Sequence, residues 1–213
     1  MLDNVTWYRQ SALRFSDGER TVYIDPWGTD EDAPPADLIL ITHAHADHYQ
    51  PDEIARLRVD GTRLIAPHDI AELLPGDVTP VAPGDVADAF GIKIQAVPAY
   101  NIVEERLDKH PKSNNWVGYL LTVGGHTYYH AGDTDHLPEL ETISTDVAFL
   151  PVGGTYTMDV PQAADLAKAM KPGIAVPMHY GFVVGTASDE EAFRKAAAPV
   201  EVQTLRPTNP FEC

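Results

Sequence analysis

The chain has 213 residues, of which 44% are hydrophobic and 22% charged. This composition is typical of one globular domain, and we expect a single domain over residues 1–213. No stretch reaches the roughly 20 apolar residues of a membrane-spanning helix. The N-terminus also lacks the basic and apolar regions of an export signal, which predicts a cytoplasmic protein. The net charge of −17 disfavours a nucleic acid partner, because phosphates would be repelled.

The first forty residues are predicted to form short strands. Strands are expected over residues 4–10, 12–16 and 20–25, with a hairpin turn at Ser16-Asp17-Gly18-Glu19 between the last two. After an acidic loop, Ala36-Asp37-Leu38-Ile39-Leu40-Ile41 is an apolar segment that predicts a buried strand. The carboxyl end of such a strand is where open α/β sheets place their active sites.

The residues that follow this strand, 42–48, read Thr-His-Ala-His-Ala-Asp-His. They contain three imidazoles and one carboxylate, the groups that hold zinc and similar ions: His43, His45, Asp47 and His48. In extended chain the first two point to the same side, and the other two lie where the chain turns before a helix. The alternative is a solvated, histidine-rich loop without metal. The density of ligands at a strand end favours the metal site.

The rest of the chain alternates between predicted strands and helices. Strands are expected at 63–66, in three pieces between 78 and 98, at 116–123, 126–130, 147–152 and 174–177, and helices at 51–58, 69–74, 159–170 and 188–197. Residues 101–115 are polar and have no clear period. Ser188 and Glu191 predict a capping box on the last helix. The alternation indicates an α/β protein with two sheets face to face and helices outside.

Three motifs carry a resemblance to a known family. The run His-x-His-x-Asp-His at 43–48 resembles the signature of the metallo-β-lactamase superfamily. Tyr129-His130-Ala131-Gly132-Asp133-Thr134 and Val176-Pro177-Met178-His179-Tyr180-Gly181 are similar to its two later ligand motifs. These forms resemble a small branch of bacterial and archaeal metal-dependent hydrolases, related to ascorbate-phosphate lactonase and N-acyl-phosphatidylethanolamine phospholipase D. The resemblance implies a four-layer αββα sandwich.

The number of candidate ligands exceeds what one catalytic zinc needs. By the resemblance, His43, His45 and Asp133 hold a first ion, and Asp47, His48, Asp133 and His179 hold a second. Asp133 would then bridge two divalent ions about 3.5–4 Å apart. Zinc is the first expectation, and manganese and iron also accept these ligands. Taken alone, Asp133 reads as a turn residue and His179 as a core histidine.

One position departs from the family pattern. Most relatives carry a further histidine at the end of the strand that here reads Ala96-Val97-Pro98-Ala99-Tyr100-Asn101. The nearest histidine is His110, in the polar segment, and we expect it to fold back as the missing ligand. The alternative is a solvated loop histidine.

The resulting expectation is a binuclear metal-dependent hydrolase with a small-molecule substrate. A metal-bound hydroxide would cleave an ester-like bond, in a phosphorylated lactone or a phosphodiester. Asp47 would accept a proton, and Tyr180 would donate to a developing oxyanion unless it is a core tyrosine. The alternative function is a metal-binding sensor or scaffold without turnover. The sequence leaves the oligomeric state open.

Overall fold

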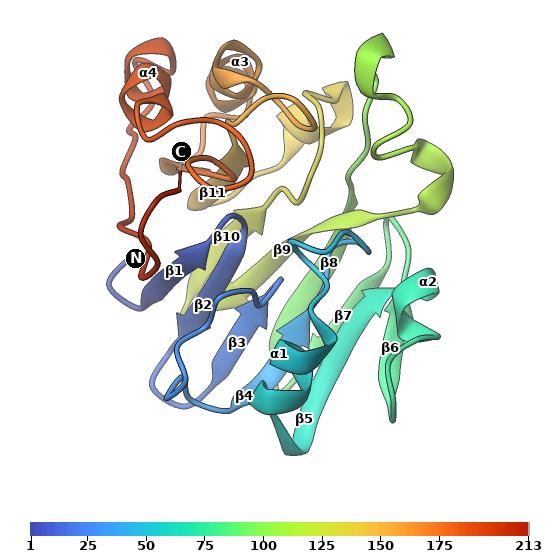
Figure 1. The fold of residues 1–213 in the computed structure, drawn as a ribbon. Helices are drawn as coiled ribbons and strands as arrows, with labels where there is room; N and C mark the ends of the chain where they lie inside the picture. Colours follow the sequence, from blue (N-terminus) through green and yellow to red (C-terminus); the bar gives the residue numbers. More distant parts are fainter. Residues whose placement is uncertain (213) are drawn as a thin grey trace.

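The computed structural model describes residues 1–212, which form two six-stranded sheets (Figure 1). The first sheet has the order β1 (Val5–Arg9), β2 (Ala12–Ser16), β3 (Thr21–Ile24), β4 (Ala36–Leu40), β5 (Arg58–Pro67) and β6 (Val78–Val81). The second has the order β12 (Ile174–Met178), β11 (Val147–Pro151), β10 (His126–His130), β9 (Val117–Val123), β8 (Ile92–Pro98) and β7 (Val86–Ala89). Cys213 lies outside the described residues.

Each sheet is antiparallel on one side and parallel on the other. In the first sheet β3 to β6 run parallel, and in the second β10 to β12 do. Carboxyl ends of parallel strands meet at one edge of a sheet, so the segments after β4, β10 and β12 are brought to neighbouring edges. The hairpin between β9 and β10 turns at Gly124 and Gly125, whose φ angles of 58° and 80° only glycine adopts readily.

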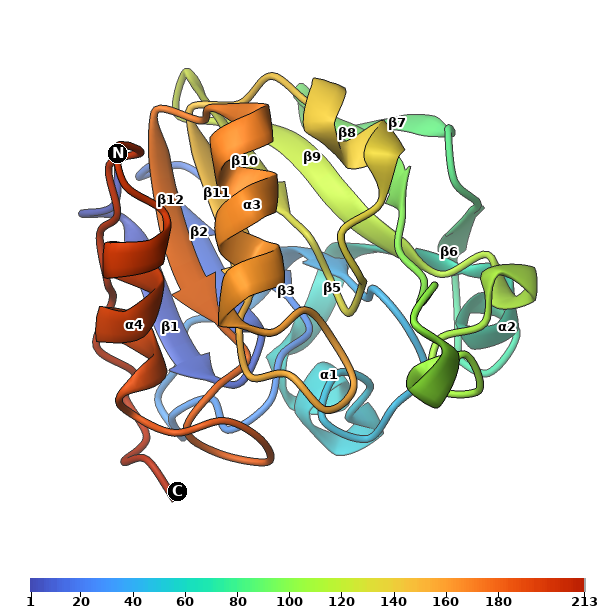
Figure 2. The same cartoon turned by 90° about the horizontal axis from the view of Figure 1, so that it is seen from above.

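Helices cover the outer faces of both sheets (Figures 1 and 2). They are α1 (Pro51–Leu57), α2 (His68–Ala71), α3 (Val160–Met170) and α4 (Asp189–Ala196), with 3-10 turns η1 (Glu104–Arg106), η2 (Lys112–Asn114) and η3 (Pro138–Thr142). The first two α-helices pack on the first sheet and the last two on the second. The αββα sandwich is therefore confirmed. In the described part of the chain, no helix has the length and apolar character needed to cross a bilayer.

Strand β4 shows how the sequence builds these layers. Leu38 and Leu40 point between the sheets into the main core, whereas Ile39 and Ile41 point outward, where they pack with Ile54 of α1. Both faces of the strand are thus buried, which explains its continuous apolar run. Each such side chain contributes about 1.5–3 kcal/mol when fully buried. This packing fixes where the strand ends and where the residues after it begin.

The capping box predicted for the last helix is wrong. Ser188 has helical angles, φ −77° and ψ −13°, and its hydroxyl lies 2.8 Å from that of Thr186. Glu191 instead pairs with Arg194 and Lys195 in its own helix. A capping box is found on α3, where Asp159 accepts from the backbone N–H of Gln162 and the Gln162 side chain accepts in return from the backbone of Asp159.

Candidate metal centre

The candidate ligands come from four segments that end at the same edge of the sandwich. The 42–48 run follows β4, Asp133 follows β10, His179 follows β12, and His110 lies in the loop between β8 and β9. His179 has φ 58°, and its backbone N–H donates to the carbonyl oxygen of Gln10 at 3.0 Å. A left-handed conformation in a non-glycine residue costs free energy, and it is typical of functional sites.

A first group of side chains surrounds one oxygen of Asp133. One ligand atom from each of four residues lies within 4.8 Å of the others: His43, His45, His110 and Asp133. The Nε2 atom of His110 is 3.3 Å, and that of His43 3.8 Å, from Oδ2 of Asp133. The Nδ1 atom of His45 lies 3.1 Å from Nε2 of His43. The loop that carries His110 therefore folds back onto the motif.

A second group lies on the other side of Asp133. Its members are Asp47, His48 and His179, again within 4.8 Å of one another. The Nε2 atom of His48 is 3.3 Å from Oδ1 of Asp133, and that of His179 is 3.1 Å from Oδ2. Oδ2 of Asp47 is 3.5 Å from Nε2 of His179. Asp133 thus contacts both groups. Its Oδ1 faces His48 of the second group, and its Oδ2 faces His110 of the first.

The geometry and chemistry of these atoms fit divalent metal ions. Three of the buried candidate ligand atoms find no hydrogen-bond partner within residues 1–212: Nε2 of His48, Nε2 of His110 and Oδ1 of Asp133. Buried polar atoms are normally paired, so each of these needs a partner. Nitrogen and oxygen ligands about 2.0–2.1 Å from a tetrahedral ion lie about 3.3 Å from one another. The distances of 3.1 to 3.8 Å to the Asp133 oxygens match this spacing.

A buried carboxylate orients two of the histidines. Oδ2 of Asp25 lies 2.7 Å from Nδ1 of His48 and accepts from the hydroxyl of Thr42 at 2.6 Å. The same hydroxyl is 3.0 Å from Nδ1 of His43. Because a carboxylate only accepts, Nδ1 of His48 is the donor in this contact, and its Nε2 faces the centre.

Asp25 was not among the predicted site residues. The sequence shows only that Asp25 ends a predicted strand; that this strand runs parallel to β4 and ends beside the motif is a property of the fold. Trp116 was also not singled out. Its ring lies 5.1 Å from the rings of His43 and His45 and 5.8 Å from that of His110, forming a wall around the first group.

Burial and charge set the protonation of the histidines. Burial is the main cause that lowers the pKa of His43 and of His45, and this favours the neutral rings that bind metals. Burial acts the same way on His48 and His179, but the nearby carboxylates, Asp133 first, overcome it. They raise the pKa of His48 well above its ordinary value and that of His179 to about 9.

The two carboxylates of the site stay ionised. Burial would raise the pKa of Asp133, but the positive charges of His179 and His48 hold it well below the ordinary value. Burial opposes the same effect at Asp47, where His48 and His179 lower the pKa to about 2. Both carboxylates are therefore negatively charged at neutral pH, the form in which a carboxylate binds a metal ion.

Tyr180 lies in the core beside the motif. It is fully buried, its ring lies 5.2 Å from that of Trp7, and its hydroxyl donates to Oε2 of Glu190 in α4 at 3.2 Å. Its hydroxyl is thus engaged away from the two ligand groups. This arrangement corresponds to the core alternative, and a role of Tyr180 in the reaction stays a prediction.

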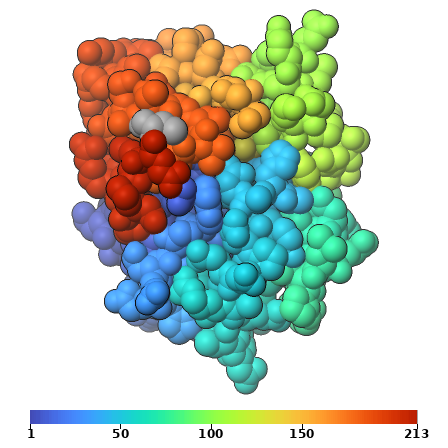
Figure 3. Space-filling view, in the orientation of Figure 1, coloured from blue at the N-terminus to red at the C-terminus, as the bar shows by residue number. Residues whose placement is uncertain are grey.

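A pocket of about 390 Å³ opens onto the two groups. Its lining residues are His45, Ala46, Asp47, Lys109, Asp133, Tyr156 and Val183. The volume lies in the range typical of small-molecule sites. The space-filling view shows the yellow-green loop of residues 101–115 above the cyan chain that follows β4 (Figure 3).

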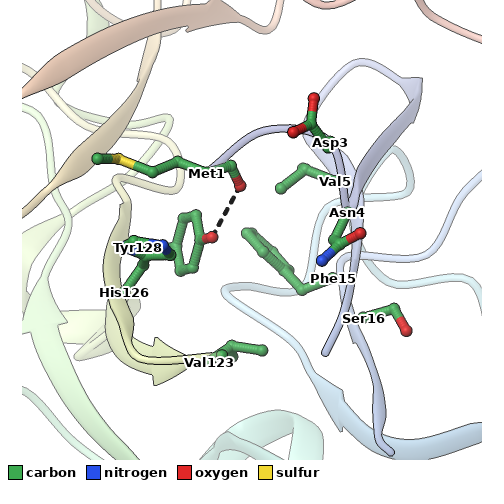
Figure 4. A pocket seen from close by; sticks show the side chains of 10 residues that line it. Met1, Asp3, Asn4, Val5, Phe15, Ser16, Val123, His126 and Tyr128 are labelled. Atoms are coloured by element: carbon green, nitrogen blue, oxygen red, sulfur yellow. Dashed lines mark hydrogen bonds between the residues drawn. The ribbon is translucent and has the colours of Figure 1, made fainter. Parts of the chain in front are cut away.

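A smaller pocket, of about 130 Å³, lies between the β1–β2 and β9–β10 hairpins (Figure 4). Phe15 and Tyr128 line it, and the Tyr128 hydroxyl donates to the carbonyl oxygen of Met1 at 2.9 Å. None of the candidate metal ligands lines it. The chemistry therefore belongs to the pocket at the edge of the sandwich.

Comparison with known proteins places the chain in a family. Residues 4–179 match the family described as the beta-lactamase superfamily domain. The UPF0173 metal-dependent hydrolase of Pyrococcus abyssi is 34% identical over 220 residues, which cover 94% of this chain and 96% of that protein.

Two solved structures share the fold. One, from Parabacteroides distasonis, has a TM-score of 0.85 and 33% identity, and the match covers 96% of this chain and 93% of the other. Igni18, a metallo hydrolase from Ignicoccus hospitalis, has a TM-score of 0.78 and 27% identity, with 96% and 95% covered. The chain belongs to the metallo-β-lactamase superfamily, and it is a metal-dependent hydrolase of that superfamily.

Proposed function

We propose that this chain is a binuclear hydrolase of small ester-like substrates. One observation carries the proposal: two separate groups of ligand atoms face each other across Asp133. His43, His45 and His110 would hold one ion, Asp47, His48 and His179 the other, and Asp133 would bridge them. Zinc is the first candidate, and manganese or iron suits the same ligands.

The ions would supply Lewis acidity, which lowers the pKa of water towards about 7. The chain's own part is to position water and substrate and to move protons. Asp47 is suited to accept the proton of the attacking water, because its carboxylate is ionised, lines the pocket and has a side chain 20% exposed. The water oxygen bonds to the carbon or phosphorus atom, and the ester bond to the leaving oxygen breaks.

The pocket suits a substrate with one anionic group. Apart from His45, Lys109 is the one basic residue among those that line the pocket. Its ammonium can pair with a phosphate of a phosphorylated lactone or of a phosphodiester. Val183 and Tyr156, both exposed, offer apolar surface at the same opening.

Hydrolysis by the Asp47→Asn variant tests the proposal. The metal-loaded protein is assayed on phosphorylated lactones, phosphodiesters and lactones without phosphate. We expect turnover of at least one anionic class, and Asp47→Asn should lower kcat by about 100-fold or more because the amide cannot accept the proton.

The matched control is Asp52→Asn, the same change at an exposed position in the first turn of α1. It should retain wild-type turnover. If Asp47→Asn hydrolyses the substrate as fast as the wild type, the proposed proton acceptor is wrong. If metal-loaded wild-type protein turns over none of the three classes, the proposed substrate class is wrong.

A further inference from the structure

The side chain of Asn101, at the start of the loop that carries His110, uses every hydrogen-bonding position it has. Its Oδ1 accepts from the backbone N–H of His110 at 3.1 Å and lies 2.9 Å from Nδ1 of the same residue. Its Nδ2 donates to Oδ1 of Asp135 at 3.1 Å and to the carbonyl oxygen of Tyr156 at 3.0 Å. An amide offers two acceptor and two donor positions, so these four contacts fix its orientation.

This orientation determines the tautomer of His110. Because the carbonyl oxygen of Asn101 only accepts, Nδ1 of His110 must carry the proton. In the neutral ring, the form that binds metals, Nε2 then carries the lone pair and faces Oδ2 of Asp133, 3.3 Å away. Two electron-rich atoms at this distance repel each other unless a cation lies between them. The buried Nε2 atom has no hydrogen-bond partner within residues 1–212, which agrees with a ligand atom.

A second layer of contacts holds Asn101 itself. Oδ2 of Asp135 accepts from the backbone N–H groups of Ile102 and Val103, at 2.7 and 2.8 Å. Its Oδ1 lies 2.6 Å from Nε of Arg106, in an ion pair that is almost fully buried. Nη2 of Arg106 donates to Gln162 in the first turn of α3 at 2.6 Å. The loop is thereby tied to the helix that covers the second sheet (Figure 2).

From these contacts we propose that Asn101 is the positioning residue for His110, with Asp135 and Arg106 holding Asn101 in place. It would orient the ring and keep the proton on Nδ1, so that Nε2 faces the first ion. The inference rests on the proposed function, because it assumes that His110 is a ligand. Partners of this kind, behind metal ligands, typically change metal affinity by 10- to 100-fold.

The test is a double-mutant cycle read out as metal binding. Metal-stripped full-length protein is titrated with Zn²⁺ against a chromophoric chelator, and with Co²⁺ by absorption spectroscopy. Asn101→Ala should weaken one of the two bound equivalents by about 10- to 100-fold and change the Co²⁺ spectrum. His110→Ala should weaken it at least as much. The double variant should match His110→Ala alone, because Asn101 acts only through that ring.

Asn114→Ala is the matched control, the same change at an exposed position of the same loop. It should bind both equivalents as the wild type does. If circular dichroism shows that Asn101→Ala does not fold, Arg106→Gln takes its place in the cycle. The expected loss is then about tenfold, and it too should vanish in the His110→Ala background.

Two results would overturn the inference, and they are distinguishable. If His110→Ala weakens binding but the Asn101 or Arg106 variant does not, or if the effects add, only the positioning role is wrong. If His110→Ala itself binds both equivalents with wild-type affinity, the ligand set of the proposed function is wrong and the inference falls with it.

Discussion

At the scale of single residues, the site depends on side chains that hold the candidate ligands in place. Asp25 contacts His48 and Thr42 together, and all three are fully buried. A buried carboxylate with this many donors is costly to disturb, because each donor would be left without a partner. The same atoms fix which nitrogen of His48 faces the centre.

We therefore expect Asp25→Asn to weaken metal binding by about 10- to 100-fold. One carboxylate oxygen accepts from Thr42 N–H and the other from the Thr42 hydroxyl and His48. The amide replaces one of these acceptors by a donor that faces donors. Competition with a chelator at fixed pH measures the affinity.

Asp37→Asn is the control for this change. Asp37 lies in β4 at the end away from the motif, where it accepts from Arg20 and from the backbone of Thr21. Its variant should keep wild-type metal affinity. Equal losses in the two variants would mean that Asp25 acts through general stability and not through His48.

At the scale of elements, α3 contributes to both stability and the loop that carries His110. Its capping box joins Asp159 to Gln162, and Gln162 also accepts from Arg106 of the loop. A substitution at the start of this helix should therefore also disturb the loop that carries His110.

We expect Asp159→Ala to lower the free energy of unfolding by about 1 kcal/mol, because the backbone N–H of Gln162 loses its acceptor. Denaturant unfolding of the metal-stripped protein measures the change. Asp165→Ala removes an exposed partner of Lys168 later in the same helix and should leave the unfolding midpoint unchanged. An Asp159→Ala midpoint equal to wild type would contradict the role of the capping box.

The elements could be predicted from the sequence where pattern and turn chemistry agree. The strand 12–16, the glycine hairpin at 124–125 and the Asp159 cap follow from local rules, and each is confirmed. The capping box at Ser188 obeys the same rule and is wrong, because the Ser188 hydroxyl pairs with that of Thr186 and the Glu191 carboxylate pairs with Arg194 and Lys195. Local rules do not rank such competitors.

At the scale of the whole molecule, the ligands meet because strands far apart in sequence end at one edge. The 42–48 run could be read from its spacing alone, but the contact of His110 with Asp133 depends on the path of a loop without periodicity. Asp25 and Asn101 gain their roles only through neighbours brought by the fold. No spacing rule in the chain points to them.

The proposed function depends on the binding of two ions by the two ligand groups. Metal content per chain, measured by plasma mass spectrometry on untagged protein purified without chelators, tests it most directly. We expect about two equivalents of divalent metal per chain. One equivalent or fewer, after dialysis against excess zinc or manganese, would contradict it.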